Sequence, residues 1–151
     1  MSRAGPDDVA RLVELMTEFY AEAGFPLNPE RAAAAFIPVV ERPELGYVWL
    51  VRADGASVGY VVLTLCYSLE YGGRSAYVDD LFIRAPYRGR GLGRSALEHV
   101  RRACEALEIR AAHLEVDRAD PAAQALYRGF GFVETDRQLL TLALASPAHA
   151  T

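Results

Sequence analysis

The chain has 151 residues, of which 52% are hydrophobic and 24% charged, with a formal net charge of −4 and a sequence pI of about 5.4. This size and composition predict one globular domain over residues 1–151, and the acidic balance argues against binding to nucleic acid, whose phosphates need a basic surface. No stretch approaches the roughly 18 uninterrupted apolar residues of a membrane-spanning helix, and residues 1–5 contain no apolar run, so we expect a cytoplasmic protein without membrane contact.

The first half of the chain predicts two helices followed by strands. Apolar residues recur at three- and four-residue spacing over residues 9–20, which predicts an amphipathic helix that ends near Gly24. A second helix is expected from Pro29, a favoured first-turn residue, through an alanine-rich stretch that stops before Pro43.

From Gly46 the residues become β-branched and aromatic, which predicts an antiparallel meander. Strands over residues 47–52 and 57–68 flank Asp54-Gly55, a strong hairpin signal. A second turn at Gly72-Gly73 leads to a strand over residues 76–83.

The second half alternates helices and strands. After a glycine-rich loop we predict a helix from Leu92 to Leu107, a strand over 111–116, a helix that opens at Asp120-Pro121, one or two closing strands over 132–144, and a tail from 146 that frays. This order predicts an α/β fold of the α+β type, in which helices flank a mixed, mainly antiparallel twisted sheet.

Neither the cysteines nor the histidines form a motif. Cys66 lies in an apolar run and Cys104 in a helical pattern, and neither belongs to a Cys-x-x-Cys pair or a Cys/His cluster. We interpret both as buried small hydrophobic residues and expect no metal site. His99, His113 and His149 share no motif, and no catalytic role is assigned to them.

The loop Arg88-Gly89-Arg90-Gly91-Leu92-Gly93 can hold a pyrophosphate. Glycines allow positive φ and close approach of the backbone to a ligand, and the first-turn amides of the next helix favour an anion. Nearby arginines, including Arg94, would add charge, unless they only form a solvated helix face. No Walker A lysine follows the last glycine, and the Rossmann pattern would require glycine at position 94, so kinase-type and nicotinamide-binding loops are disfavoured.

Two blocks carry a resemblance to a known family. Arg88-x-x-Gly91-x-Gly93 resembles the acetyl-CoA pyrophosphate loop of the GNAT N-acetyltransferase superfamily. Asp120-x-x-Ala123-x-x-Leu126-Tyr127-x-x-x-Gly131-Phe132 resembles that family's Asn-x-x-Ala-x-x-x-Tyr-x-x-x-Gly-Phe motif. The blocks span about residues 77–132. The resemblance implies a GNAT-like acyl-CoA N-acyltransferase fold with acetyl-CoA as co-substrate, although the family's short first strand has no clear counterpart before Asp7.

The resemblance also implies which residues contact the cofactor. The strand before the loop would bind the pantetheine arm and the loop amides the pyrophosphate, which gives the set Leu81, Phe82, Ile83, Arg88, Gly89, Arg90, Gly91, Gly93, Arg94 and Asp120. The family prefers asparagine at position 120, and an aspartate before proline is also a good helix N-cap, so both roles stay open for Asp120.

Three residues are candidates for proton transfer. By resemblance, Tyr127 would donate a proton to the departing CoA thiolate; the alternative is an ordinary core tyrosine. Asp79 and Asp80 offer a proton acceptor, and because successive strand residues face opposite sides, we expect only one to enter the site. Family members more often carry glutamate at position 79, so the shorter aspartate favours a water relay. A solvated or cap-forming acidic pair is the alternative.

We expect the acceptor to approach from the meander and the two leading helices. Tyr20, Phe25, Glu70 and Tyr71 are candidate substrate contacts, and the acidic residues favour the primary amine of a small molecule. Acetylation of a protein or peptide and non-catalytic binding of acyl-CoA stay as alternatives. The family often forms homodimers, and the alternating apolar residues 139–144 suit either a dimer contact or a core strand.

Overall fold

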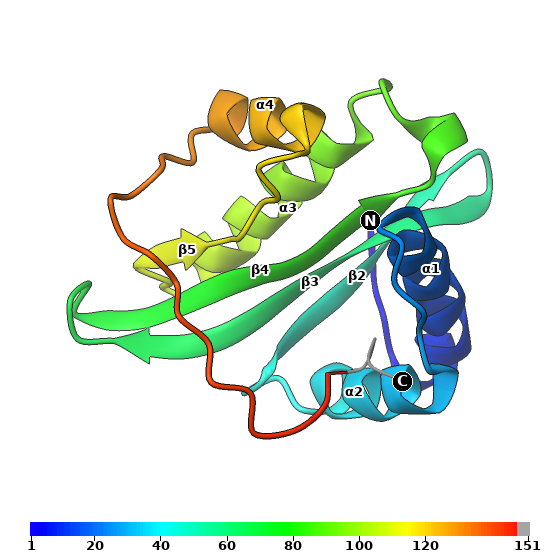
Figure 1. The fold of residues 1–151 in the computed structure, drawn as a ribbon, viewed down its shortest axis with the longest axis horizontal. Coiled ribbons are helices and arrows are strands. Elements are labelled where there is room, and N and C mark those ends of the chain that lie inside the picture. Colours follow the sequence, from blue (N-terminus) through cyan, green and yellow to red (C-terminus); the bar gives the residue numbers. More distant parts are fainter. Residues whose placement is uncertain (148–151) are drawn as a thin grey trace.

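The computed structural model describes residues 1–147 and contains one sheet with helices on both faces (Figure 1). The sheet order is β1-β2-β3-β4-β5, in which neighbours from β1 to β4 are antiparallel and β4 and β5 are parallel. The strands are β1 (Ser2–Arg3), β2 (Gly46–Ala53), β3 (Ala56–Ser68), β4 (Gly73–Ile83) and β5 (Ala111–His113). This arrangement confirms the predicted mixed, mainly antiparallel sheet.

The helices lie at the positions that the apolar spacing predicts. They are α1 (Val9–Glu22), α2 (Pro29–Glu41), α3 (Leu92–Ala106) and α4 (Pro121–Phe130), with 3₁₀ turns at Pro6–Asp8 and Ala85–Tyr87. The side chain of Asn28 caps α2 by accepting a hydrogen bond from the Arg31 N–H at 2.9 Å, directly before Pro29 in the first turn. In the described part of the chain, no helix is both long and apolar enough to cross a membrane.

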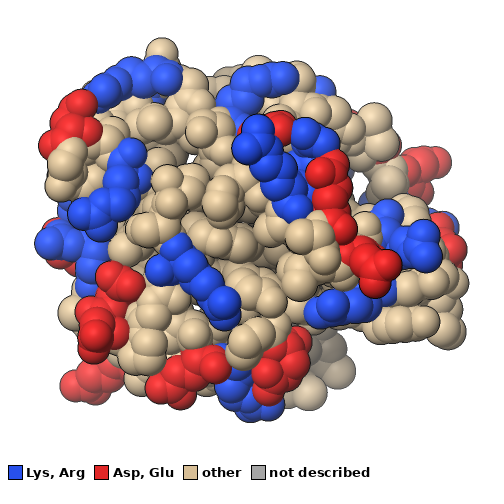
Figure 2. All heavy atoms as spheres, turned by 180° about the vertical axis from the view of Figure 1, so that it is seen from behind, with Lys and Arg blue, Asp and Glu red and all other residues tan. Residues whose placement is uncertain are grey.

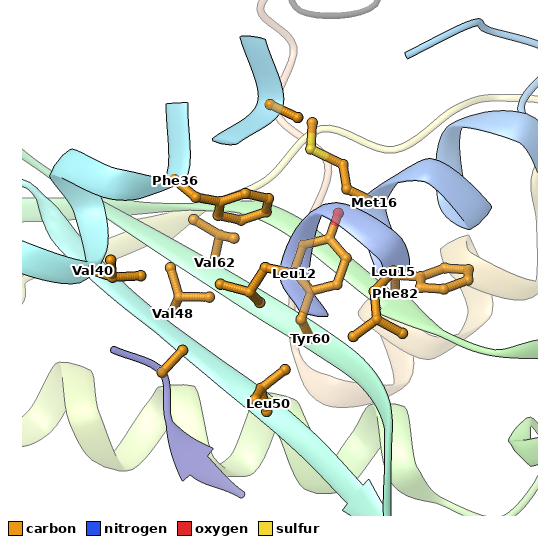
Figure 3. Packing of buried hydrophobic residues seen from close by; sticks show 12 residues of the cluster. Leu12, Leu15, Met16, Phe36, Val40, Val48, Leu50, Tyr60, Val62 and Phe82 are labelled. Atoms are coloured by element: carbon orange, nitrogen blue, oxygen red, sulfur yellow. The ribbon is translucent and has the colours of Figure 1, made fainter. Parts of the chain in front are cut away.

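Each face of the sheet has its own core. Figure 3 shows the cluster beneath α1 and α2, where buried side chains from both helices meet those of β2, β3 and β4. Its members are Ala4, Leu12, Leu15, Met16, Ala32, Phe36, Val40, Val48, Leu50, Tyr60, Val62 and Phe82. A second cluster packs the opposite face against α3, through residues such as Trp49, Val61, Ala96 and Val100.

Two local features of the strands matter for the site. Asp54 and Gly55 have φ of 51° and 78°, which is the turn that the Asp-Gly signal predicts between β2 and β3. On β4 the pairing with β3 shifts, so that Val62 faces Asp80 and Leu63 faces Val78. Asp79 is therefore the extra residue of a β-bulge, which breaks the strict alternation of side chains at this point.

Three sequence expectations are wrong. Residues 132–144 form no strand in the described structure, because they run past the sheet without pairing with it (Figure 1). The strand expected over 111–116 ends at His113, where the chain leaves β4. Cys66 is exposed, with its Sγ 3.0 Å from the Ser75 Oγ, whereas Cys104 is buried as expected.

The N-terminal end of the chain differs from expectation, and the C-terminal tail lies largely outside the described residues. A first strand does precede Asp7, because β1 pairs with β2 through Ser2 and Leu50. Two residues are too short for any periodicity to reveal. Of the tail predicted to fray, Ser146 and Pro147 are exposed, and 148–151, including His149, lie outside the described residues.

Candidate functional site

The site begins where β4 and β5 separate. The two strands pair only from Ser75 with Ala111 to Tyr77 with His113. Beyond that point β4 continues to Ile83, whereas the chain after β5 rises toward α4 (Figure 1). Within the described residues, the β5 side of this last part of β4 has no neighbouring strand, so its backbone groups on that side can bind an extended ligand.

The free edge of β4 leads into the glycine loop. Gly89 and Gly91 have φ of 73° and 78°, a left-handed conformation that favours glycine, and no described atom lies within 4 Å of where a Cβ would stand on either. The Ser95 N–H donates to the Gly91 carbonyl oxygen at 2.9 Å as the first helical bond of α3. The amides that precede Ser95 are therefore available to an anion.

Gly93 serves a different purpose. A Cβ at this position would stand 3.0 Å from the Leu126 Cδ2. The missing side chain thus lets α4 pack closely against the first turn of α3, which places Tyr127 on the helix beside the loop.

The loop arginines bind other parts of the protein. Arg88 donates from Nε to the Ile83 carbonyl oxygen at 2.7 Å and from Nη2 to Glu22 at 2.6 Å. Arg90 forms a bidentate pair with Asp54, at 2.9 and 3.3 Å. These contacts tie the loop to α1 and to the turn between β2 and β3.

The remaining arginines of this region follow the same pattern. Arg94 donates to the Gly129 carbonyl oxygen at 3.2 Å, and Arg84 binds Glu14 and Glu18 of α1. Figure 2 shows basic side chains lying beside acidic ones on one face of the molecule, without one continuous basic area. The predicted arginine cluster is therefore largely paired, and its first role is to fix the loop.

Asp80 is the better placed of the two candidate acceptors. It faces α1, and its Oδ2 accepts a hydrogen bond of 2.8 Å from the Tyr60 hydroxyl. Burial raises the pKa of Asp80 to about 7, an effect that the Tyr60 hydrogen bond opposes and the charge of Asp79 increases. Asp79 is more exposed, and partial burial of its carboxyl raises its pKa as well.

Tyr127 and Asp120 lie on α4. Burial raises the pKa of Tyr127 to about 12, with smaller contributions from the charges of Asp120 and Asp80. The Asp120 Oδ1 accepts from the Ala123 N–H at 2.9 Å, so this aspartate caps α4. Asp80 and Tyr127 are thus close enough to interact electrostatically, although they come from different elements.

The family follows from a direct comparison. A model of the acetyltransferase (GNAT) family matches residues 10–132 of the chain. The chain belongs to this family. The matched range contains the free edge of β4, the glycine loop and Tyr127.

Three individual proteins are similar to this GNAT chain over different shares of its length. It is 34% identical over 67 residues to an uncharacterized N-acetyltransferase, YycN, of Bacillus subtilis (strain 168); this match covers 44% of the chain and 43% of YycN, less than half of that relative's length. The integron cassette protein HFX_CASS3, from the mobile metagenome of Cole Harbour Salt Marsh, is 44% identical with a TM-score of 0.91, covering 99% of this chain and 93% of that one. The aminoglycoside N-acetyltransferase AAC(6')-Iy, solved in complex with CoA, shares the fold with a TM-score of 0.78 at 15% identity, over 95% and 93% of the two chains.

The candidate substrate contacts of this GNAT chain fall in two separate places. Tyr20 lies at the end of α1, where the charges of Asp80 and Asp79 contribute to raising its pKa to about 12 after the larger effect of burial. Glu70 and Tyr71 lie at the turn between β3 and β4, roughly 30 Å along the strand from Asp80 at about 3.3 Å per residue.

The acidic residues therefore do not form one amine-binding set. Glu70 is paired with Arg137 at 2.7 Å, and Tyr71 lies 5.5 Å from the His113 ring, between centroids. Phe25 follows α1 and is 52% exposed, on the same part of the molecule as Tyr20.

Sequence reasoning missed Tyr60. Its side chain has no measurable exposure, and its hydroxyl contacts Asp80 across two strands. In the sequence it is one aromatic residue in an apolar strand, which is typical of a core position. Only the register of β3 against β4 reveals its partner.

Proposed function

We propose that this chain transfers an acetyl group from acetyl-CoA to the primary amine of a small molecule, within a ternary complex. The observation that carries the proposal is the continuity of the free β4 edge with a loop of left-handed glycines at the start of α3. Family membership supports acetyl-CoA as the donor, and the fold neighbour that was solved with CoA is consistent with it.

The residues present fit this co-substrate. The backbone of Leu81, Phe82 and Ile83 would hold the pantetheine arm, and the amides from Gly89 to Arg94 would hold the pyrophosphate. The open space at Gly89 and Gly91 admits an anion close to the backbone. Arg90 and Arg94 would supply charge once they exchange their present partners for phosphate.

The reaction needs one bond made, one broken and two protons moved. The amine nitrogen attacks the thioester carbonyl carbon, so a C–N bond forms as the C–S bond breaks. The nitrogen loses its proton to the Asp80 carboxylate, and the departing sulfur takes the phenolic proton of Tyr127. With a pKa of about 12, Tyr127 is protonated at neutral pH, and exchange with water restores both groups.

A small cationic amine suits this arrangement. Tyr20 of α1 lies close enough to Asp80 for the charge of Asp80 to raise its pKa, and a carboxylate there attracts the protonated amine. The bound amine first releases one proton to solvent, and the neutral amine then attacks and gives its second proton to Asp80. Acetylation of a protein or peptide is the rival activity, and non-catalytic binding of acyl-CoA is the rival class. A panel of small amines, run beside a peptide array with labelled acetyl-CoA, separates the three.

Calorimetric titration with acetyl-CoA and CoA tests the proposal. Arg90→Ala should weaken binding roughly 10-fold or more by loss of a charge-assisted hydrogen bond. Arg42→Ala is the matched control, since Arg42 also pairs with an exposed carboxylate at 2.9 Å, that of Glu44, and it lies between α2 and β2. Wild-type protein that binds neither acetyl-CoA nor CoA would contradict the proposal.

Transfer itself is measured as acetylated amine by mass spectrometry. The chain contains no lysine, so side-chain self-acetylation cannot obscure the product. Tyr127→Phe should lower kcat by roughly 10²–10⁴ while CoA affinity is kept, because the general acid is lost and the ring is not. An unchanged rate across pH would remove Tyr127 from the mechanism.

We also propose that the enzyme is a homodimer. The support is the exposed apolar segment 133–147 together with the open edge of β5, which two copies related by a two-fold axis can satisfy reciprocally.

A further inference from the structure

Tyr60 and Asp80 form a polar pair inside an otherwise apolar cluster. Figure 3 shows the Tyr60 ring rising from β3 among the side chains beneath α1 and α2. Its ring centroid lies 5.8 Å from that of Phe36 and 6.3 Å from that of Phe82. A phenylalanine would fill the same space without burying a hydroxyl, so packing alone gives no reason for the phenol.

The hydroxyl of Tyr60 is held by Asp80. The 2.8 Å bond runs to Oδ2, which leaves Oδ1 as the other oxygen of the carboxylate for exchange of a proton with an amine. Burial and the charge of Asp80 raise the pKa of Tyr60 far above its ordinary value. Tyr60 therefore keeps its proton and acts only as a donor in this pair.

We propose that Tyr60 is a positioning residue, whose hydroxyl orients the Asp80 carboxylate and stabilises its ionised form for removal of the amine proton. This inference rests on the proposed acetyl transfer. Tyr60 acts through Asp80 and contacts no reacting atom itself, because its side chain is completely buried. Tyr60 lies outside both of the motif blocks that carry the resemblance to the family.

The electrostatic balance at Asp80 gives the hydroxyl its effect. The groups that interact with this carboxylate come from four elements: Tyr60 on β3, Asp79 on β4, Tyr20 on α1 and Tyr127 on α4. Burial and Asp79 favour the protonated acid, whereas the Tyr60 hydrogen bond favours the carboxylate. Removing the hydroxyl therefore raises the pKa of Asp80 and makes the base less available at neutral pH.

The test is Tyr60→Phe, read out as the pH profile of kcat/KM for an amine that the panel identifies. We expect the acidic limb to move up by about one to two pH units, the equivalent of one hydrogen bond to a charged group, with CoA affinity unchanged. Tyr47→Phe, which removes a hydroxyl from neighbouring β2, should leave the limb in place. An unmoved limb in Tyr60→Phe would overturn the inference.

Two further measurements keep the inference separate from the proposed function. The carboxyl titration of Asp80, followed by NMR in isotopically labelled unliganded protein, should shift upward in Tyr60→Phe even if no amine is acetylated. An unshifted midpoint overturns the positioning role, whereas absence of transfer by wild-type protein overturns the proposed function. Asp80→Asn should remove the limb that Tyr60→Phe moves and leave only the limb at the pKa of the free amine. An unchanged limb would show that another group is the base.

Discussion

At the scale of single residues, the position of Asp80 on β4 lowers the stability of the folded protein at neutral pH. A carboxyl that is buried beneath α1 has a raised pKa, about 7, so the folded protein holds a proton there that the unfolded chain releases near its ordinary value of 3.8. Between these two values the folded state binds more protons, and stability therefore falls as the pH rises. The group suits proton transfer near neutral pH and weakens the fold under the same conditions.

Replacing Asp80 with asparagine should expose this cost. Asparagine never ionises, so the variant lacks the loss of stability that wild type undergoes as Asp80 ionises. The difference in free energy of unfolding, Asp80→Asn minus wild type, should therefore increase by up to about 3 kcal/mol between pH 5 and pH 8. Denaturant unfolding at the two pH values measures it. Asp54→Asn is the control, because the Arg90 hydrogen bond lowers the pKa of Asp54 and keeps it ionised throughout this range. A difference that does not vary with pH would contradict the buried, protonated Asp80.

At the scale of elements, the glycine loop is held by its neighbours on three sides. Arg88 binds the last residue of β4 and the end of α1, Arg90 binds the β2–β3 turn, and α4 packs on Gly93. These exposed ion pairs each contribute little to stability, but together they connect the loop to α1 and to the β2–β3 turn. The loop can thus present its amides to an anion without an ordering step.

Gly91→Ala tests the conformation of this loop. An L-residue in the left-handed region costs roughly 1–2 kcal/mol, so the free energy of unfolding should fall by about that amount and CoA affinity at least 10-fold as the amides move. Gly5→Ala is the control, since Gly5 has an extended φ of −123° and open space around it. Denaturant unfolding and calorimetry give the two readouts. Equal stabilities for the two variants would show that the loop tolerates another conformation.

At the scale of the whole molecule, the segment after α4 is the part that a single chain does not bury. Residues 133–147 are all exposed, and the apolar ones reach high fractions: Val133 82%, Leu139 60%, Leu140 86%, Leu142 84% and Leu144 90%. Soluble monomers rarely expose so much contiguous apolar surface. Within the described residues β5 pairs with β4 alone, and it lies beside a cavity of about 300 Å³, which residues 130–133 also line.

Leu142→Glu should therefore change the assembly. A charge within the contact between two copies is unfavourable, so sedimentation should shift from dimer to monomer while the circular dichroism of the fold is kept. Ile37→Glu, on the outer side of α2 and 42% exposed, should leave the dimer intact. A wild-type protein that sediments as a monomer would contradict the proposed homodimer.

The sequence predicts features that depend on local chemistry. The spacing of apolar residues locates α1 and α3, and Pro29 with the alanine-rich stretch locates α2. Asp54-Gly55 locates a hairpin, and Asp120 before Pro121 locates the cap of α4. Helix periodicity, turn conformation and capping each depend on residues that are close in sequence, so they can be predicted from a single sequence. The resemblance of the two motif blocks likewise indicates the GNAT family, which the family comparison confirms over residues 10–132.

Only the tertiary structure decides which distant residues meet. The pairing of β4 with β3 shifts by one residue at Asp79, and Tyr60 meets Asp80 only through that register. Glu70 proves remote from Asp80, and residues 132–144 find no strand to pair with in the described chain. Strand pairing and burial are set by contacts between segments far apart in sequence, and the pKa of a carboxyl follows from them. The sequence by itself therefore determined the family, the helices and the hairpin turn, because these depend on local chemistry. The three-dimensional arrangement decided which of the two carboxylates meets Tyr60, because that depends on strand register.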